Sequence, residues 1–291
     1  MMQNRIAFVL TITLCLGGCT GFFFQPHRTQ VHSPDEIPLK FEDVYFHAVD
    51  GVQLHAWFLP AQGKAKGTIL HLHGNAENIS THIASVYWMP ERGFNVFMLD
   101  YRGYGKSAGT PTLPGVLSDI DAAMATLVIR PDIDPNRIAI LGQSLGGALA
   151  VYYVAHSSYR SHICTLVIDS AFTGYREITR EKLASFWLTW PFQYPISWTI
   201  DDDYSPIDAI AQVSPIPLLI IQGKNDHIVP VEHAKQLFAA ARQPKTLWIE
   251  NDTGHIRALD RPAVRDALDK YLTENLARLP KVSAIAVDPM P

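Results

Sequence analysis

Apolar residues occur in this chain as short, separate runs that alternate with longer segments of helix length. The first two runs, residues 44–48 and 53–59, flank the turn dipeptide Asp50-Gly51, which is typical of an antiparallel hairpin. Six further runs follow, at residues 68–71, 95–99, 137–141, 165–168, 217–221 and 246–249. Short, β-branched runs are typical of strands buried on both faces of a mostly parallel sheet. The pattern therefore predicts an α/β domain over residues 41–278, with an eight-stranded sheet, a leading antiparallel hairpin and helices on both faces.

One segment, residues 174–210, interrupts this alternation of strands and helices. It contains a run from Phe186 to Trp198 that is rich in aromatic residues. An insertion of this kind between two strands predicts a small helical cap over a pocket. Two alternatives remain open for its aromatic side chains: they line a cleft for an acyl group, or they are buried against the core.

The first residues of the chain have the pattern of a processing signal. Arg5 precedes an apolar run, residues 6–16, which is too short to span a bilayer but has the length of a signal-peptide core. The run ends in Leu16-Gly17-Gly18-Cys19, which resembles the lipobox of a bacterial lipoprotein. This resemblance implies a signal peptide over residues 1–18 and diacylation of Cys19. An ordinary signal peptide or an uncleaved N-terminal helix is the alternative.

A lipidated Cys19 would attach the protein to a membrane of the bacterial cell envelope, because several acyl chains together hold a protein at a bilayer surface. Thr20 follows the cysteine where inner-membrane lipoproteins carry aspartate, and this resemblance to sorting signals favours the outer membrane over the inner. Residues 19–40 contain three prolines and predict a lipidated tether. Residues 279–291 are expected to form a C-terminal tail.

Composition limits the classes of function. The chain has 291 residues, of which 47% are hydrophobic and 18% charged, as expected of an ordinary globular domain. Its formal net charge is −4 and it has no run of Lys and Arg, so nothing indicates nucleic-acid binding. A small molecule or a lipid is therefore the expected partner, and these features do not predict an oligomeric state. Once Cys15 is removed and Cys19 acylated, Cys164 remains, and its apolar surroundings predict a buried packing residue.

The most informative motif is Gly142-Gln143-Ser144-Leu145-Gly146, which joins a predicted strand to an alanine-rich helix. It has the spacing of a nucleophile elbow, in which a serine stands on a turn so tight that side chains two residues before and after it would collide with the backbone. Ser144 would then be exposed at the carboxyl end of the strand. The amide of Leu145, at the start of the helix, would be free to bind a developing oxyanion. The motif is neither a dinucleotide fingerprint nor a phosphate loop.

A nucleophilic serine needs a base to take its proton and a carboxylate to orient that base. Asp226 follows the apolar run at 217–221, and His255 follows the last predicted strand. The order Ser144, Asp226, His255 is that of α/β hydrolases. His227 is the chief competitor for the base, but it adjoins Asp226 and would have difficulty in reaching back to it.

The other half of the oxyanion site is expected in the turn after the strand at 68–71. A backbone amide following His73-Gly74 would face the amide of Leu145, and Asn75 is the first choice, with Ala76 next. His71 and His73 have no third ligand at a suitable spacing, so they predict no metal site, and His73 is expected to pack and form a hydrogen bond within the loop.

Two further groups of charged residues are expected to be structural. Asp100 and Arg102 are expected to brace the loop that follows their strand. Residues 201–203, three aspartates in succession, are expected to form a solvated loop. We expect no metal and no cofactor in this protein.

These motifs together resemble the α/β-hydrolase family, and more narrowly its compact branch with serine-aminopeptidase-like domains and protein depalmitoylases. The resemblance covers roughly residues 40–278 and is carried by residues 73–78, 99–107, 142–147, 169–172, 223–226 and 254–255. It implies a serine hydrolase that cleaves ester or thioester bonds of an acyl substrate. Members of this fold with other chemistries carry aspartate or cysteine at the elbow, so Ser144 argues against them.

Two other functions remain open at this point. One is cleavage of amides in peptides with a free N-terminus, which an acidic group near the cap, among residues 201–203, would favour. The other is a non-enzymatic envelope lipoprotein that uses the same fold as a scaffold. A scaffold has no physical need for Ser144, Asp226 and His255 together.

Overall fold

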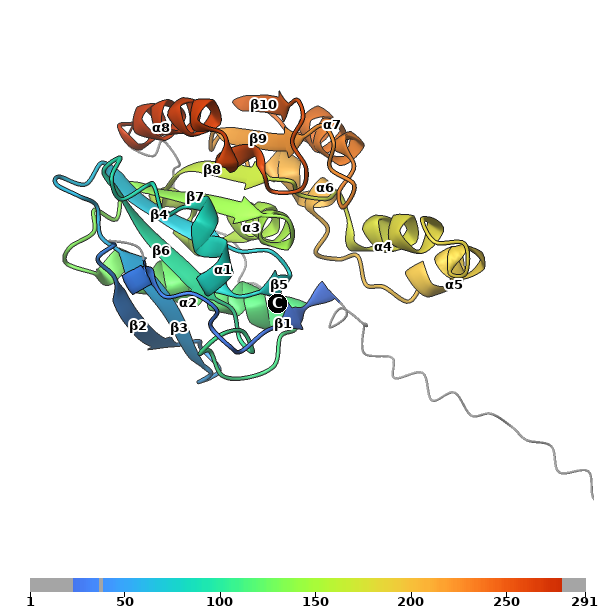
Figure 1. Cartoon of the computed structure of the whole chain (residues 1–291), viewed down its shortest axis with the longest axis horizontal. Coiled ribbons are helices and arrows are strands. Elements are labelled where there is room, and N and C mark those ends of the chain that lie inside the picture. The colour runs from blue at the N-terminus through green and yellow to red at the C-terminus, as the bar shows by residue number, and fades with distance from the viewer. Residues whose placement is uncertain (1–22, 37–38, 279–291) are drawn as a thin grey trace, which may run out of the picture.

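The computed structural model describes residues 23–36 and 39–278 (Figure 1). The predicted signal peptide, Cys19 and the C-terminal tail lie outside these residues. Within the described ranges, the helices all lack the length or the apolar character needed to cross a membrane.

A single mixed sheet of eight strands forms the centre of the domain, in the order β10-β9-β8-β7-β4-β6-β3-β2. Its strands are β2 (Glu42–His47), β3 (Gln53–Leu59), β4 (Gly67–Leu72), β6 (Phe94–Asp100), β7 (Ile138–Gln143), β8 (Ile163–Asp169), β9 (Leu218–Gly223) and β10 (Lys245–Glu250). β2 and β6 pair antiparallel with β3, and all other pairs are parallel. The predicted fold class is confirmed, and each strand ends within two residues of its expected bounds.

Helices cover both faces of the sheet, because side chains on successive strand residues point to opposite sides. The helices are α1 (Ile79–His82), α2 (Leu113–Ile129), α3 (Leu145–His156), α4 (Tyr175–Ala184), α5 (Gln193–Ser197), α6 (Pro206–Ala209), α7 (Val231–Ala240) and α8 (Pro262–Leu276). One core holds side chains of α2, α3 and α7, and a second core holds those of α1 and α8.

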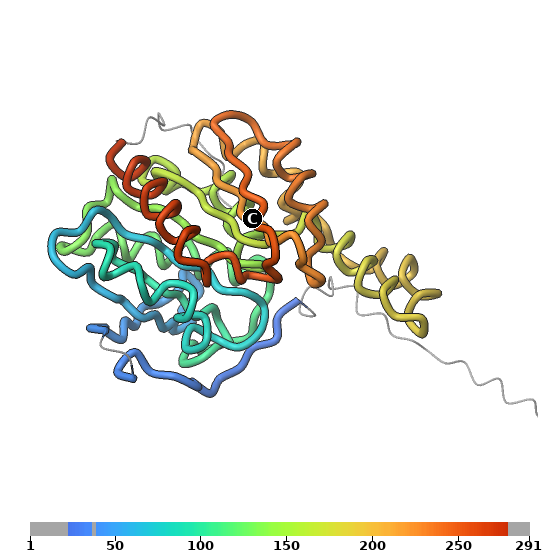
Figure 2. Tube along the Cα trace, turned by 45° about the horizontal axis from the view of Figure 1, so that its top comes forward, coloured from blue at the N-terminus to red at the C-terminus, as the bar shows by residue number. Residues whose placement is uncertain are grey.

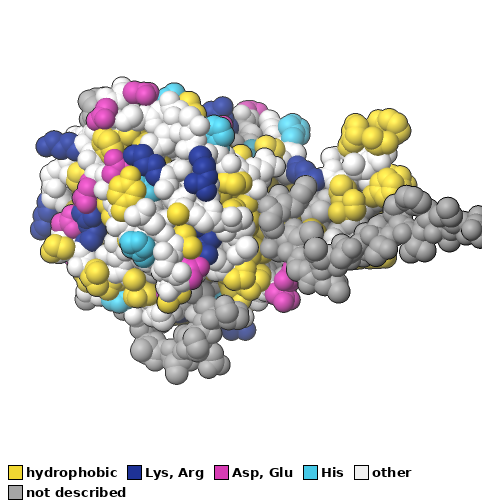
Figure 3. Space-filling view, turned by 90° about the horizontal axis from the view of Figure 1, so that it is seen from below, with side chains coloured by type: hydrophobic (Ala, Val, Ile, Leu, Met, Phe, Trp, Pro, Cys, Tyr) yellow, Lys and Arg dark blue, Asp and Glu magenta, His cyan; other side chains and the backbone are white. Residues whose placement is uncertain are grey.

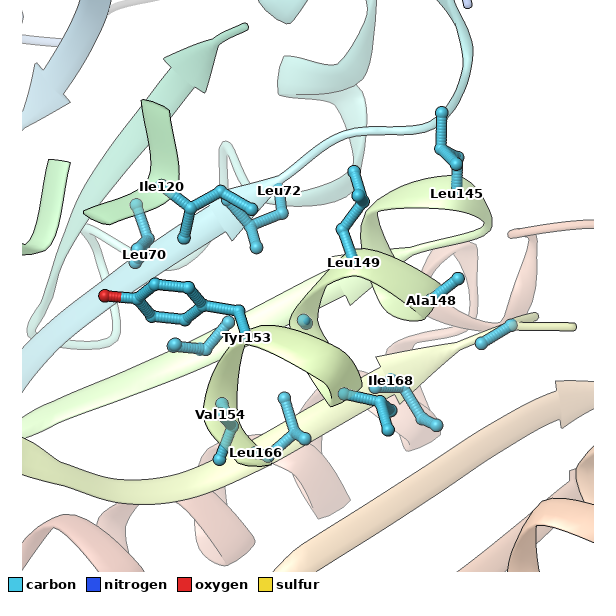
Figure 4. Packing of buried hydrophobic residues seen from close by; sticks show 14 of the residues in the cluster. Leu70, Leu72, Ile120, Leu145, Ala148, Leu149, Tyr153, Val154, Leu166 and Ile168 are labelled. Carbon is cyan, nitrogen blue, oxygen red and sulfur yellow. The ribbon is translucent and has the colours of Figure 1, made fainter. Parts of the chain in front are cut away.

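Helix α3 connects the centre of the sheet to one of these cores. Figure 4 shows its residues Leu149 and Tyr153 beside Leu70 of β4 and Leu166 of β8. All four side chains are buried. Burial of this apolar surface holds the start of α3 firmly against the carboxyl ends of the central strands.

Part of the predicted tether lies on the domain. β1 (Gln25–Pro26) pairs with β5 (Ala76–Glu77), and the Asn78 side-chain amide donates to the carbonyls of His27 and Thr29, at 2.8 Å each. Figure 2 shows this N-terminal segment, in blue, running along the surface of the domain. The tether prediction did not include these contacts, because they are made mainly by backbone groups, which a side-chain pattern does not report.

The insertion at 174–210 is helical as predicted, but α4 and α5 project from the domain as an arm (Figure 1). The expectation that its aromatic side chains are buried against the core is wrong. Trp187 is 78% exposed and Trp198 is 70% exposed, so they do not pack into the core, and a cleft for an acyl group stays a prediction. No other element of the described chain covers these side chains, so their apolar character alone does not bury them.

Cys164 is buried, as predicted, with its Sγ 3.0 Å from the carbonyl oxygen of Asn136. Burial raises the pKa of its thiol to about 11. Cys164 is therefore an un-ionised packing residue at neutral pH.

Asp100 and Arg102 brace the loop after β6, as expected. An oxygen of the buried Asp100 carboxylate accepts from the amide of Ile79 at 3.0 Å. The guanidinium of Arg102 donates from Nη2 to Asp119 at 2.8 Å and from Nη1 to Asp50 at 2.7 Å. The Asp119 side chain is fully buried, so Arg102 neutralises a charge that has no access to water.

Replacing Arg102 with alanine is expected to lower the free energy of unfolding by about 3 kcal/mol, because Asp119 would keep a buried charge without a partner. Urea denaturation followed by circular dichroism measures this change. The matched control is Lys235→Ala, which removes an ion pair between two exposed side chains of α7 and should leave stability nearly unchanged. Equal stability of both variants would contradict the bracing role of Arg102.

Candidate active site

Ser144 stands between β7 and α3 on a strained turn. Its φ of 53° and ψ of −116° lie in a region that residues other than glycine rarely adopt. A Cβ at Gly142 would lie 2.3 Å from the carbonyl oxygen of Gly146, and one at Gly146 would lie 2.1 Å from that of Leu72. Both distances are far below contact distance, so the steric reason for the two glycines is confirmed.

The structure brings the three residues expected to act together into one hydrogen-bonded chain. His255 Nε2 lies 3.0 Å from Ser144 Oγ, and His255 Nδ1 lies 2.8 Å from Asp226 Oδ2. Their elements explain this meeting: β7, β9 and β10 are all parallel, so the residues that follow them gather at one edge of the sheet. His227, the competing histidine, is exposed.

Asp226 is buried and held in its ionised form. Burial acts to raise the pKa of this carboxyl, but the hydrogen bond and charge of His255, together with the amides of Ile228 and Val229, outweigh burial and hold the pKa below its ordinary value. Both amides donate to Asp226 Oδ1 at 2.8 Å, and the Gln222 side chain donates to Oδ2 at 3.0 Å. An ionised Asp226 can therefore accept a hydrogen bond from the N–H at Nδ1 of His255. This bond fixes the tautomer of the imidazole.

The turn after β4 lies directly against the elbow. A Cβ on Gly74 would be 3.6 Å from Ser144 Cβ. The Nδ1 of His73 donates to the carbonyl of Gly74 at 2.7 Å. Because the N–H and C=O of a trans peptide point in opposite directions, this bond fixes the direction of the Asn75 amide. The expectation that His73 packs and forms a hydrogen bond in this loop is confirmed.

His73 remains neutral in this position. Burial, and secondarily the charge of His82, holds its pKa well below its ordinary value. Two tyrosines of the loop after β6 also hold the turn: Tyr101 Oη donates to the carbonyl of His73 at 3.0 Å, and Tyr104 Oη donates to that of Asn75 at 2.6 Å. The backbone beside Ser144 is thus fixed from two directions.

Leu145 is the first residue of α3, and amides in the first turn of a helix have no partner within the helix. Its amide directly follows Ser144, and Gly74 lies beside Ser144. The amides of Leu145 and Asn75 are the two groups that the sequence predicts for an oxyanion site.

Sequence reasoning missed a buried polar chain beneath the elbow. Gln143 Nε2 donates to Asp169 Oδ2 at 3.1 Å, and Ser170 Oγ donates to Asp169 Oδ1 at 3.1 Å. Ser170 Oγ in turn accepts from the amide of Ile256 at 3.1 Å. Since Ile256 follows His255, this chain connects the elbow strand to the histidine loop. Its only sequence signal is a polar pair, Asp169-Ser170, at the end of a predicted strand.

The remaining candidates have structural partners. Across the described residues, no group of three or more His, Cys, Asp and Glu side chains is placed to hold a metal ion. His71 Nε2 lies 3.1 Å from Gln143 Oε1. In the aspartate run, Asp202 Oδ1 accepts from the amide of Arg176 at 3.0 Å, and Asp201 Oδ1 accepts from the amide of Asp203 at 3.0 Å.

Comparison with protein families places this chain among known hydrolases. Residues 63–205 match the family described as serine aminopeptidase, S33, and residues 194–281 match the family described as TAP-like protein. The chain is 40% identical to the uncharacterised protein YfhR of Escherichia coli K12, over 88% of this chain and 90% of YfhR. It is 34% identical to the α/β-hydrolase domain-containing protein WAV2 of Arabidopsis thaliana, over 76% of this chain and 74% of WAV2.

Solved structures of low sequence identity share the fold. An esterase of Pyrococcus furiosus has a TM-score of 0.70 and 21% identity, covering 89% of this chain and 98% of the esterase. Acetyl xylan esterase 1 of Thermoanaerobacterium has a TM-score of 0.63 and 16% identity, covering 87% of each chain. The chain belongs to the α/β-hydrolase family, with a serine-aminopeptidase-like domain, and is similar along most of its length to YfhR.

Proposed function

We propose that this protein is a serine hydrolase that cleaves ester or thioester bonds of acyl substrates. The observation that carries the proposal is the hydrogen-bonded chain from Ser144 through His255 to Asp226. These three hydrogen-bonded residues lie at the carboxyl edge of the sheet, where α/β folds have their ligand-binding sites. The serine is partly exposed, whereas the carboxylate is buried. Ser144 is therefore accessible to a substrate, whereas Asp226, which only orients His255, is shielded from it.

In the proposed reaction, Ser144 Oγ attacks the carbonyl carbon while His255 Nε2 takes its proton. Asp226 stabilises the positive charge that develops on His255. The imidazolium then returns the proton to the departing alcohol or thiol, leaving an acyl group on Ser144. A water molecule, deprotonated by His255, attacks that acyl group, and the proton returns to Ser144 Oγ as the acid leaves.

The oxyanion of both tetrahedral intermediates would be bound by the amides of Leu145 and Asn75. The hydrogen bond from His73 to the Gly74 carbonyl supports this role, because it fixes the Asn75 amide before substrate arrives. Donors fixed in this way stabilise charge in the transition state without a cost of reorganisation. No metal or cofactor is required for this chemistry.

Cleavage of peptides with a free N-terminus is the alternative, and the family match at residues 63–205 makes it worth testing. It would need an acidic group available to bind the amine. Of the three candidates in the aspartate run, Asp201 and Asp202 accept hydrogen bonds from amides of their own segment and of α4, whereas Asp203 is exposed. Failure to cleave aminoacyl amides would exclude this alternative.

The predicted lipid attachment through Cys19 remains part of the proposal. It would place the protein at the bacterial cell envelope, with the outer membrane favoured over the inner. Acyl groups of lipids would then be available to Ser144.

Labelling with a fluorophosphonate probe tests the proposed nucleophile without knowledge of the substrate. The full chain in detergent is expected to be labelled, and Ser144→Ala is expected to lose the label entirely, because the probe reacts only with an activated serine. Asp226→Asn should label at least about 100-fold more slowly, since it leaves His255 without its orienting charge.

Ser158→Ala is the matched control, because it removes a serine hydroxyl at an exposed position away from the proposed nucleophile. It should keep its label. Labelling of Ser144→Ala at the rate of the unaltered protein would exclude Ser144 as the nucleophile. If the folded, unaltered protein did not react, the scaffold alternative would be favoured.

Asp169 gives a separate test through the pH dependence of stability. Burial raises its pKa to about 6, although the hydrogen bonds from Gln143 and Ser170 act to lower it. In the unfolded chain the same carboxyl has an ordinary pKa of about 3.9. Between these values the folded protein binds the additional proton, so this group lowers the free energy of unfolding as pH rises from about 4 to 6. Ionisation of Asp169 in the folded protein therefore opposes stability by about 3 kcal/mol.

Asp169→Asn cannot ionise, so the loss of stability between about pH 4 and 6 is expected to be smaller than in the unaltered protein. Urea denaturation at several pH values across this interval measures the difference. Asp252→Asn, at an exposed position, is the control and should follow the unaltered protein. Identical pH dependence of Asp169→Asn and the unaltered protein would show that folding does not raise the pKa of Asp169.

A further inference from the structure

The arm formed by α4 and α5 carries a concentration of exposed aromatic and aliphatic side chains. Its exposed large hydrophobic residues are Phe186, Trp187, Leu188, Trp190, Phe192, Tyr194, Ile196 and Trp198. Figure 3 shows hydrophobic side chains gathered on the part that projects from the domain. A continuous apolar surface of this kind is rare on a soluble protein and marks a site of interaction.

The same stretch carries no charge. Residues 183–200 contain no Asp, Glu, Lys, Arg or His. Elsewhere in the described chain the exposed hydrophobic residues, such as Val49 and Ile129, lie on separate elements. Tryptophan and tyrosine are the residues that concentrate at the boundary between lipid headgroups and acyl chains, because each has an apolar ring with a polar group at one end.

The chain also enters the domain at the base of this arm. The ring of Phe23 lies edge-on to that of Tyr175, the first residue of α4, with 4.9 Å between ring centroids. The sequence before Phe23 includes the apolar run at residues 6–16. An N-terminal segment attached to a membrane would therefore hold the base of the arm close to that membrane.

Helix α4 of the arm forms hydrogen bonds with α7, which follows the loop of Asp226, and with that loop. Glu181 of α4 lies 2.9 Å from His233 Nε2 of α7, and Lys182 Nζ donates to the carbonyl of His227 at 3.1 Å. In Figure 1 the strands of the parallel sheet point toward the side from which the arm projects. The arm and the edge that carries Ser144 therefore face the same side of the molecule.

We propose that the arm docks on a phospholipid bilayer, with its aromatic side chains in the interfacial region. The uncharged aromatic surface, and the position of Phe23 at its base a few residues after the apolar run in the sequence, both favour a bilayer over a second copy of this chain. Docking would direct the carboxyl edge of the sheet toward lipid. The proposal goes beyond acyl hydrolysis and does not depend on the activity of Ser144.

Tryptophan fluorescence gives a direct test, because three of the 6 tryptophans lie on the arm: Trp187, Trp190 and Trp198. Trp57 and Trp88 are buried in the domain. The full chain is reconstituted into phosphatidylcholine vesicles with and without brominated acyl chains, which quench only tryptophans that contact them. We expect brominated lipid to remove up to about half of the emission, since interfacial tryptophans reach the acyl chains.

The matched variant replaces Trp187, Trp190 and Trp198 with phenylalanine, which keeps the surface apolar but removes the reporters. It should bind vesicles and show little quenching. The control Trp248→Phe, at a position in β10, should retain the quenching. Equal quenching of the triple variant and the unaltered protein would place the lipid contact elsewhere and overturn the proposal.

A second pair of variants tests the surface itself. Leu188→Glu adds a charge to the arm and should weaken quenching of the arm tryptophans, whereas Ile129→Glu, at an exposed position of α2, should not. Vesicle-bound protein without quenching would overturn the proposal. So would arm tryptophans shielded from both brominated lipid and aqueous acrylamide in a cross-linked dimer, which would identify a second copy as the occupant. Fluorophosphonate labelling of the same samples reports separately on Ser144.

Discussion

The close approach of the elbow to the end of β4 is the contact on which the site depends. Gly146 has no room for a side chain because the carbonyls of Leu72 and His73 occupy that space. The same approach puts the turn at Gly74 beside Ser144. Burial of α3 against the sheet holds this contact closed. The position of the proposed nucleophile and that of its proposed oxyanion site are thus consequences of one packing event.

Two carboxylates near this contact show how local donors decide between charge and neutrality. Both Asp226 and Asp169 are buried, and burial acts to raise both pKa values. Asp226 receives two backbone amides, an amide side chain and His255, so its charged form is favoured. Asp169 receives one amide side chain and one hydroxyl, which do not compensate for burial. Within one site, Asp226 is therefore held in its ionised form, whereas Asp169 has a raised pKa of about 6.

Sequence predicts those features that each residue's own neighbours in the chain determine. Every strand of the main sheet has an apolar run, and the elbow has a glycine spacing that only one kind of turn requires. Asp226 and His255 follow from chain order, which reports the edge of the sheet at which they lie. The link from Asp169 through Ser170 to Ile256 could not be predicted, because it joins loops 86 residues apart through a hydroxyl. The exposure of Trp187 could not be predicted either, since the identity of an aromatic residue does not show whether another element of the fold covers it.

Apolar side chains of the arm are exposed to water, whereas the proposed site is largely buried, and the two regions are in contact. Around Ser144, the side chains of Ser144, His255 and Asp226 are joined by hydrogen bonds, so their positions are fixed before substrate arrives. On the arm, apolar groups remain in water, at a cost in free energy that only another apolar phase removes. The hydrogen bond between His233 Nε2 and Glu181 joins these two regions near the loop that carries Asp226. A bilayer that removed the arm's aromatic side chains from water would therefore also orient the proposed nucleophile toward the acyl groups of its lipids.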